Sequence, residues 1–368
     1  MEKVSRLNTY FRGDKVILII AVILSLISFY IVPSSTHRFG SQMIHILACY
    51  GAMILFYKID YRTLSAGSDL LLIFAFVLAI LTVFVGTDDR SVTIGGFSMQ
   101  TFYFIGFLLI FFISKFIAIR LNKGEELSTK ETLILFGIIG IFCLLFAKSN
   151  LSTAIILGVS CFAILFIGNL DRKYLFGFIA MAMVVGVIYF GFGLGKSDTG
   201  ISRVSNFSAS RNFDQVPDRE TSLYIKQMVL AQAAIARSAW TPAGPGQGEI
   251  KNVLAEKETD YVYATVVEEV GIVVGGLIIL LYLILFFRAM RVARLSEGYF
   301  GRLLAIGIGF WITFQALIHI GVNCAAIPAT GQTLPLISRG GSSLLFSGIM
   351  FGMLLNISKN TENEKYSF

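Results

Sequence analysis

The sequence predicts an all-α polytopic integral membrane protein, and three observations support this fold class. The 368 residues are 55% hydrophobic and 14% charged, whereas an average soluble chain carries about 25% charged residues. The mean hydropathy is +0.76. The apolar residues gather in long runs, and the charged residues lie between them. This composition excludes intrinsic disorder for the bulk of the chain, because disordered segments combine low hydrophobicity with high charge.

Ten apolar segments are long enough to cross a bilayer as helices. A hydrocarbon core of about 30 Å needs roughly 20 helical residues, because each residue adds about 1.5 Å. No segment large enough for a soluble domain remains, so residues 1–368 are expected to form a single membrane domain. The first segment lacks a small-residue cleavage site and is expected to stay as a helix. The segments are residues 15–33, 41–57, 69–87, 100–119, 131–148, 151–170, 174–194, 261–287, 302–325 and 341–357.

The basic residues of the short loops orient these segments by the positive-inside rule. The loops on one side hold Arg38, Arg90, Lys148 and Arg339. The termini and the loops on the other side hold far more: Lys3, Arg6, Arg12, Lys15, Lys58, Arg62, Arg120, Lys123, Lys130, Arg172, Lys173, Arg288, Arg291, Arg294, Arg302, Lys359 and Lys365. Both termini are therefore predicted to be cytoplasmic.

A large extracytoplasmic loop, residues 195–260, is predicted between the seventh and eighth segments. Loops this long are typically functional or disordered. Disorder fits residues 197–217, which are rich in Ser, Asn, Asp and Arg. Residues 222–239 repeat apolar side chains at helical spacing, which predicts an amphipathic helix either on the outer membrane face or packed on the bundle. Residues 88–99 predict a second outer loop that resembles a hairpin.

The charge, Cys and His contents point to no other class of protein. The formal net charge of +7 is what cytoplasmic Lys and Arg produce in a membrane protein, so no nucleic-acid partner is expected. The four Cys residues lie in apolar runs without CxxC spacing, and the three His residues form no HExxH pair. The sequence therefore indicates neither a disulfide framework nor a zinc site.

Three carboxylates at the end of the large loop are unusual beside a membrane segment. Asp260 stands where the eighth segment begins. It suits a helix N-cap, because a carboxylate accepts backbone N–H bonds there, and it equally suits a functional role. Glu268 and Glu269 lie two turns deeper, where a buried carboxylate needs a basic or amide partner.

Two glycine-containing segments suit close contact with an anion. Gly244-Pro245-Gly246-Gln247-Gly248 is either a flexible turn or a backbone free to approach an anion. Residues 330–343, which read Thr-Gly-Gln-Thr-Leu-Pro-Leu-Ile-Ser-Arg-Gly-Gly-Ser-Ser, predict a re-entrant loop and a helix start. The free N–H groups of a helix start, together with Arg339, suit a phosphate-bearing substrate.

These motifs together resemble the SEDS family (FtsW, RodA and SpoVE). The resemblance rests on Asp260 followed by Glu268-Glu269-Val270-Gly271, on Gly244-Pro245-Gly246 before it, and on residues 330–343. The ten-segment layout with a large outer loop extends the resemblance over nearly the whole chain. The sequence of residues 334–338 is more similar to FtsW than to RodA.

The resemblance implies a peptidoglycan glycosyltransferase in the bacterial cytoplasmic (inner) membrane, with its active site on the extracytoplasmic face. It would join lipid II by inverting β-1,4 glycosyl transfer in septum synthesis and release undecaprenyl diphosphate. The family's essential acid maps onto Asp260, the expected general base. The candidates for binding the diphosphate and the sugars are Lys148, Ser152, Thr153, Arg203, Arg211, Glu268, Glu269, Thr330, Ser338, Arg339, Ser342 and Ser343.

The implied partners are a class B penicillin-binding transpeptidase and other membrane proteins of the divisome or elongasome. No cofactor is certain; a divalent cation (Mg²⁺ or Mn²⁺) at Asp260 is an open expectation, with no clear second ligand in the sequence. A RodA-type elongation polymerase, a lipid II flippase and a scaffold for a transpeptidase remain alternatives. The sequence also departs from the family pattern Gln-Pro-Ser-Glu-x-x-Lys, because Tyr103 and Gly106 replace the acid and the lysine, and Arg339 stands where Tyr is frequent.

Overall fold

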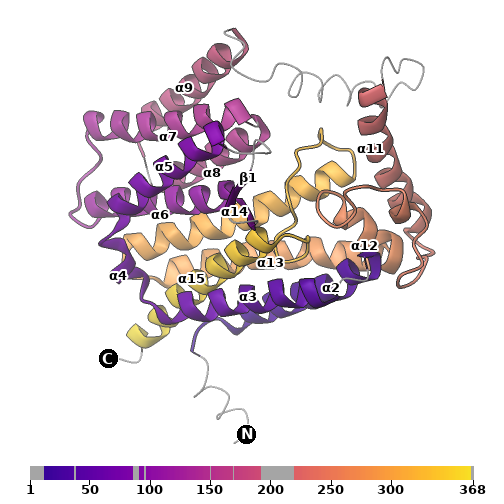
Figure 1. Ribbon diagram of the computed structural model, residues 1–368. Helices are drawn as coiled ribbons and strands as arrows, with labels where there is room; N and C mark the ends of the chain where they lie inside the picture. Colours follow the sequence, from indigo (N-terminus) through magenta and orange to yellow (C-terminus); the bar gives the residue numbers. More distant parts are fainter. Residues whose placement is uncertain are drawn as a thin grey trace, which may run out of the picture.

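The protein is a bundle of long helices with one short β-hairpin (Figure 1). The computed structural model describes residues 12–36, 39–85, 91–94, 97–149, 151–168, 170–191 and 219–365. The helices are α2 (Lys15–Thr36), α3 (Phe39–Lys58), α4 (Tyr61–Ser65), α5 (Ser68–Val85), α6 (Thr101–Leu121), α7 (Thr129–Ser149), α8 (Leu151–Ile167), α9 (Arg172–Gly191), α11 (Arg219–Ser238), α12 (Val262–Val270), α13 (Ile272–Leu295), α14 (Tyr299–Asn323) and α15 (Gly341–Lys365). The other elements are the strands β1 (Ser91–Ile94) and β2 (Phe97–Gln100) and the 3₁₀ turn η1 (Ile250–Asn252).

The ten predicted apolar segments all fall on helices. Among the described residues, seven helices are long and apolar enough to cross a membrane: α2, α3, α6, α7, α13, α14 and α15. The helices α5 and α8 are shorter apolar helices, and α9 occupies the seventh predicted segment. The prediction of an all-α membrane protein is confirmed. The hairpin, in which β1 pairs antiparallel with β2, lies in the predicted outer loop.

The eighth predicted segment, residues 261–287, is not one helix. The chain breaks at Gly271, whose φ of 86° and ψ of 170° end α12 and precede α13. An L-residue with a side chain rarely adopts this backbone conformation, so glycine makes the break. Hydropathy stays high across the break, which is why the sequence pattern missed it. As a result, Asp260 precedes a short helix of nine residues rather than a membrane span.

The predicted amphipathic helix is α11, and it packs on the bundle. Its buried face includes Met228, Ala231 and Ala234. The two alanines join a cluster with Tyr261 and Ala264, beside and within α12. Of the two alternatives that the sequence left open, the structure shows the packed helix. The predicted disordered stretch, residues 197–217, lies outside the described residues.

Small residues allow α15 to lie directly against α3. Gly348 and Gly352 stand one turn apart on α15, and a Cβ added to either would overlap the backbone carbonyl of Cys49 or Met53 on α3. Membrane helices associate closely through such pairs of small residues, because little hydrophobic force acts between helices within lipid.

The two ends of the bundle carry different segments of the chain. At one end, Asp14 accepts a bond from Arg288 Nε at 2.7 Å, and its backbone N–H donates to Ser358 Oγ at 2.6 Å. These residues lie near the first and last described residues and at the end of α13, so this end gathers the loops that are predicted to be cytoplasmic. The helices α11 and α12 lie at the opposite end (Figure 1).

Candidate active site

Two sequence motifs meet at the end of the bundle that carries α12. Ser338 Oγ donates a hydrogen bond to the Thr259 carbonyl at 2.8 Å. The backbone N–H of Arg339 donates to the Glu258 carbonyl at 2.7 Å, and its Nη1 donates to Glu258 Oε2 at 2.8 Å. The segment before Asp260 and the segment before α15 therefore form one unit, although they lie far apart in the sequence.

This unit borders a polar cavity of about 410 Å³. The cavity is lined by residues 255–259, by residues 339–342, and by His45 and Gln100. The lining contains both charges, because Lys257 and Arg339 face the same space as Glu256 and Glu258. Helix α15 begins at this cavity, and its first backbone N–H groups lack intrahelical hydrogen-bond partners. The positive end of the helix dipole therefore adds to the positive charge of the basic side chains.

Asp260 follows the cavity segment directly and is half-buried. Its backbone carbonyl accepts a hydrogen bond from Asn323 Nδ2 at 3.0 Å, and Asn323 Oδ1 accepts from the backbone N–H of Ala264 at 3.0 Å. The N-cap position of α12 is occupied by Tyr261. Asp260 therefore lies one residue before the cap, and Asn323 at the end of α14 fixes its backbone.

The loop before α15 folds back into the bundle, as expected of a re-entrant segment. Leu334, Leu336 and Ile337 are fully buried. The Tyr282 hydroxyl, from the interior of α13, donates to the Pro335 carbonyl. The loop is therefore a rigid support for Ser338 and Arg339.

One face of α14 holds the beginning of the same loop. Gln315 Nε2 donates to the Thr333 carbonyl at 2.9 Å, and His319 Nδ1 lies 2.6 Å from the Gln332 carbonyl. Together with Asn323, these residues repeat every four positions, which places them on one helix face. This spacing of polar side chains in an apolar helix was a signal for the site that the sequence analysis missed.

Tyr103 and Gly106 occupy the places of the acid and the lysine of the family pattern. The Tyr103 hydroxyl lies 2.7 Å from Thr333 Oγ1 and accepts from the Thr333 backbone N–H at 3.2 Å. A Cβ at Gly106 would overlap the ring of Trp311, which is fully buried. Tyr103 therefore makes hydrogen bonds between neutral groups, and Gly106 makes room for an aromatic ring.

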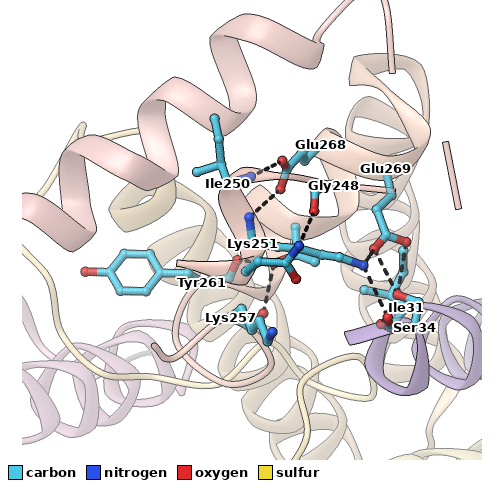
Figure 2. A network of polar contacts seen from close by, with 11 residues as sticks. Ile31, Ser34, Gly248, Ile250, Lys251, Lys257, Tyr261, Glu268 and Glu269 are labelled. Atoms are coloured by element: carbon cyan, nitrogen blue, oxygen red, sulfur yellow. Dashed lines mark hydrogen bonds and ion pairs between the residues drawn. The ribbon is translucent and has the colours of Figure 1, made fainter. Parts of the chain in front are cut away.

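Glu268 and Glu269 form the buried network that Figure 2 shows. Glu269 pairs with Lys251 Nζ, and Ser34 Oγ at the end of α2 donates to both Glu269 oxygens at 2.9 and 3.0 Å. Glu268 accepts the backbone N–H groups of Ile250 and Lys251 at 2.7 and 2.9 Å. The prediction that at least one of the two glutamates meets a basic or amide group is confirmed. In the structure both carboxylates bind groups of the protein itself, and their expected contact with substrate stays a prediction.

The Gly244–Gly248 segment lies on α12. The backbone N–H groups of Ala243 and Gly244 donate to the carbonyls of Glu268 and Glu269 at 2.9 and 3.2 Å. A Cβ at Gly248 would lie 2.8 Å from Glu268 Cδ. Gly248 thus serves close packing on α12, whereas Gly244 and Gly246 adopt positive φ values of 93° and 74°.

The remaining predicted site residues fall into three groups. Ser342 Oγ accepts from the Gln100 backbone N–H at 3.1 Å, and Ser343 Oγ lies 2.6 Å from Thr333 Oγ1. The second group lies on α8 and in the loop before α15. Thr153 Oγ1 accepts from Gln332 Nε2 at 3.3 Å, and Ser152 is half-buried in the first turn of α8. In the loop, Thr330 Oγ1 is buried without a partner among the described residues. Outside the described residues are Arg203, Arg211 and the side chain of Lys148.

Burial shifts the pKa of a tyrosine in the first turn of α12. It raises the pKa of Tyr263 to about 12, with a smaller contribution from Cys324, so this phenol is protonated at neutral pH. In the described part of the chain, no three His, Cys, Asp or Glu side chains are grouped to hold a metal ion. A divalent cation at Asp260 therefore stays a prediction from the sequence, since Mg²⁺ is often held by one or two carboxylates together with substrate phosphates.

Comparison with known proteins agrees with this arrangement. The chain matches the FtsW/RodA/SpoVE model, described as cell cycle protein, over residues 13–363. It is 32% identical over 279 residues to "Probable peptidoglycan glycosyltransferase FtsW" of Francisella salina, which covers 71% of this chain and 65% of that protein. It is 28% identical over 298 residues to "Stage V sporulation protein E" of Bacillus subtilis (strain 168), which covers 78% of each chain.

Solved structures share the fold at lower identity. The RodA protein of Thermus thermophilus superposes with a TM-score of 0.67 at 18% identity, over 96% of this chain and 98% of that one. A chain from "Structural coordination of polymerization and crosslinking by a peptidoglycan synthase complex" gives a TM-score of 0.74 at 18% identity, over 95% and 98% of the two chains. Because the family model spans nearly the whole sequence, this chain is a member of the FtsW/RodA/SpoVE family.

Proposed function

We propose that this protein polymerises peptidoglycan glycan strands from lipid II at the extracytoplasmic face of the bacterial cytoplasmic membrane, in septum synthesis. Its membership of the family and the names of its FtsW relatives support the activity and the division role. The observation that carries the proposal is the union of the Asp260 segment with the Arg339 segment around one polar cavity, at the bundle end opposite to the termini.

The reaction requires a base for a sugar hydroxyl and stabilisation of a leaving diphosphate. Asp260 takes the proton of the acceptor hydroxyl as its oxygen attacks the anomeric carbon of the donor. The bond from that carbon to the diphosphate oxygen breaks, and undecaprenyl diphosphate leaves. A single displacement inverts the α-linked donor into a β-1,4 bond. The half-buried position of Asp260 suits this role, since Asp260 directly follows the residues 255–259 that line the cavity and its backbone carbonyl is held by Asn323.

The start of α15 supplies groups for the negative charge of the leaving group. Arg339, Ser342 and the first N–H groups of α15 line or adjoin the cavity. Donors that are fixed before the reaction stabilise developing charge without reorganisation. No step is assigned to a metal ion. Because the lipid tail must stay in the bilayer, a site at the end of the bundle lets the sugars project outward while the tail remains in lipid.

Polymerisation of lipid II by the purified protein tests the proposal. Asp260→Asn preserves the shape of the side chain and removes the base, so we expect glycan chains from the wild type and none from the variant. Asp171→Asn is the matched control, because Asp171 is exposed between α8 and α9 and its carboxylate pairs with the exposed Lys173. Size-exclusion profiles establish that each variant is folded. Normal polymerisation by folded Asp260→Asn would show that Asp260 is not the base.

Two further arms separate the proposal from its alternatives. Vesicles that hold lipid II in one leaflet distinguish transport, which moves lipid II unchanged, from polymerisation, which consumes it. The peptidoglycan synthase complex of similar fold supports a class B penicillin-binding transpeptidase as a partner. Addition of a cognate transpeptidase should raise the rate of glycan synthesis, and an unchanged rate would remove this partner from the proposal.

A further inference from the structure

The large outer loop carries one exposed tryptophan at the start of a membrane-spanning helix. Trp240 is 84% exposed and follows α11 by two residues. Its neighbour Ala239 accepts a hydrogen bond from the backbone N–H of Ile272, the first residue of α13, at 2.9 Å. The backbone of Trp240 therefore lies at the level where α13 begins.

The outward face of α13 is apolar from its first turn. Val273 is 76% exposed, and the exposed stripe continues through Leu277 and Leu280 toward the other end of the helix. In a helix that spans a membrane, such a stripe faces the lipid tails. The boundary between tails and headgroups consequently lies close to Ile272, and Trp240 lies beside that boundary.

From residue 225 on, where the side chains of α11 are described, its apolar face packs against α12 and α14. Met228, Ala231 and Ala234 are buried in the protein. Between residues 225 and 261, where the structure describes the side chains, the exposed large apolar residues are Trp240 and Val253. Of these two, only Trp240 adjoins the start of a membrane-spanning helix in the backbone contacts.

From these contacts we infer that Trp240 inserts into the headgroup region of the bilayer and anchors the large loop there. Tryptophan is enriched at this depth, because its ring is apolar and its indole N–H needs a polar partner. The anchor also fixes the depth of α12: Ala243 and Gly244, three and four residues after Trp240, bond to the carbonyls of Glu268 and Glu269. The occupant of this surface is thus lipid, and a protein partner is the competing outcome of the test.

The sequence makes this inference directly measurable, because it contains two tryptophans and the other one, Trp311, is fully buried. In the full-length Trp311→Phe variant, Trp240 is the sole tryptophan. This variant is reconstituted into phosphatidylcholine vesicles whose acyl chains carry bromine either near the headgroup or near the chain end. We expect shallow bromine to quench about half of the emission, deep bromine to quench much less, and aqueous acrylamide to quench weakly, as aromatic residues at the interface require.

A second measurement covers the case in which Trp311→Phe fails to fold. The difference between the emission of the wild type and of Trp240→Leu isolates the same indole, and Trp240→Leu alone reports the buried Trp311 as the control. Emission that acrylamide quenches strongly and that brominated lipid leaves unchanged would overturn the inference, because the indole would then face water. In that case the exposed ring would be available to a protein partner in water instead of lipid.

Discussion

Asn323 joins Asp260 to the helix that follows it. Its side-chain amide donates to the Asp260 carbonyl at 3.0 Å, and its side-chain oxygen accepts from the Ala264 backbone N–H at 3.0 Å. Asn323 is fully buried at the end of α14. One residue therefore sets where the proposed base stands relative to the bundle, without touching its carboxylate in these bonds.

Asn323→Ala should lower the rate of glycan polymerisation by about 10- to 100-fold, because a misplacement of about 1 Å costs that much at a catalytic centre. The loss should appear in kcat more than in KM, since the substrate contacts of the cavity remain. Asn360→Ala is the control, because Asn360 makes its side-chain bonds near Asp60 and Asn356 at the other end of the bundle. Equal rates for Asn323→Ala and the control would contradict a positioning role for Asn323.

Lys251 and Glu269 predict a large and specific stability coupling. Their side chains are 2% and 0% exposed, so Lys251→Met leaves a buried carboxylate without its cation and should cost about 3–5 kcal/mol of unfolding free energy. Adding Glu269→Gln should restore most of this loss, because the uncompensated charge is gone and Ser34 can still bond to the amide. Thermal unfolding in detergent measures the double-mutant cycle.

The exposed pair Arg237–Glu249 provides the internal comparison for that cycle. It lies in the same part of the chain, with side chains 66% and 74% exposed. Exposed pairs contribute less than about 1 kcal/mol. A cycle on Lys251 and Glu269 that gave a coupling as small as that of Arg237 and Glu249 would show that the buried network does not hold α12.

Periodicity and charge predicted the fold well because membrane helices are long and apolar. Nine of the ten predicted segments each fall on one helix, the eighth falls on two, and the outer loop 88–99 contains a hairpin. The break at Gly271 was not predicted, since the hydropathy of a segment is an average that a single glycine hardly changes. The sequence also could not show whether α11 lies on the membrane or packs on the bundle, because an apolar helix face can bind to either surface.

The parts of the site that form sequence motifs were predicted, and the parts that depend on contacts between distant segments were not. The motifs around Asp260 and Arg339 were found from the sequence, and the structure places them together. Lys251 gave no signal, because a single lysine in a polar loop is ordinary until Glu269 is seen beside it. The role of Asn323 could not be predicted, because it depends on how close α14 lies to α12, and no local sequence pattern gives that distance.

Gly248→Ala should disturb the same network by sterics alone. The added Cβ would lie 2.8 Å from Glu268 Cδ, so the carboxylate must move away from the backbone N–H groups of Ile250 and Lys251. We expect a loss of about 1–3 kcal/mol, the cost of disturbing a buried polar group. Gly276→Ala on α13 has open space at its Cβ and should instead stabilise the helix by about 0.5–1 kcal/mol. Opposite shifts of the unfolding temperature confirm this reasoning, and a neutral Gly248→Ala contradicts it.

Arg339→Ala should weaken the binding of lipid II. Arg339 is 29% exposed at the cavity, where one guanidinium nitrogen bonds Glu258. Loss of a charged hydrogen bond to a diphosphate costs about 1.5–3 kcal/mol, so we expect kcat/KM to fall about 10- to 100-fold. Glu258→Gln keeps the arginine and removes only its partner, which separates the charge of Arg339 from its placement. An unchanged kcat/KM in Arg339→Ala would show that Arg339 does not bind the diphosphate, and Lys257 and the first N–H groups of α15 would be the next donors to test at the cavity.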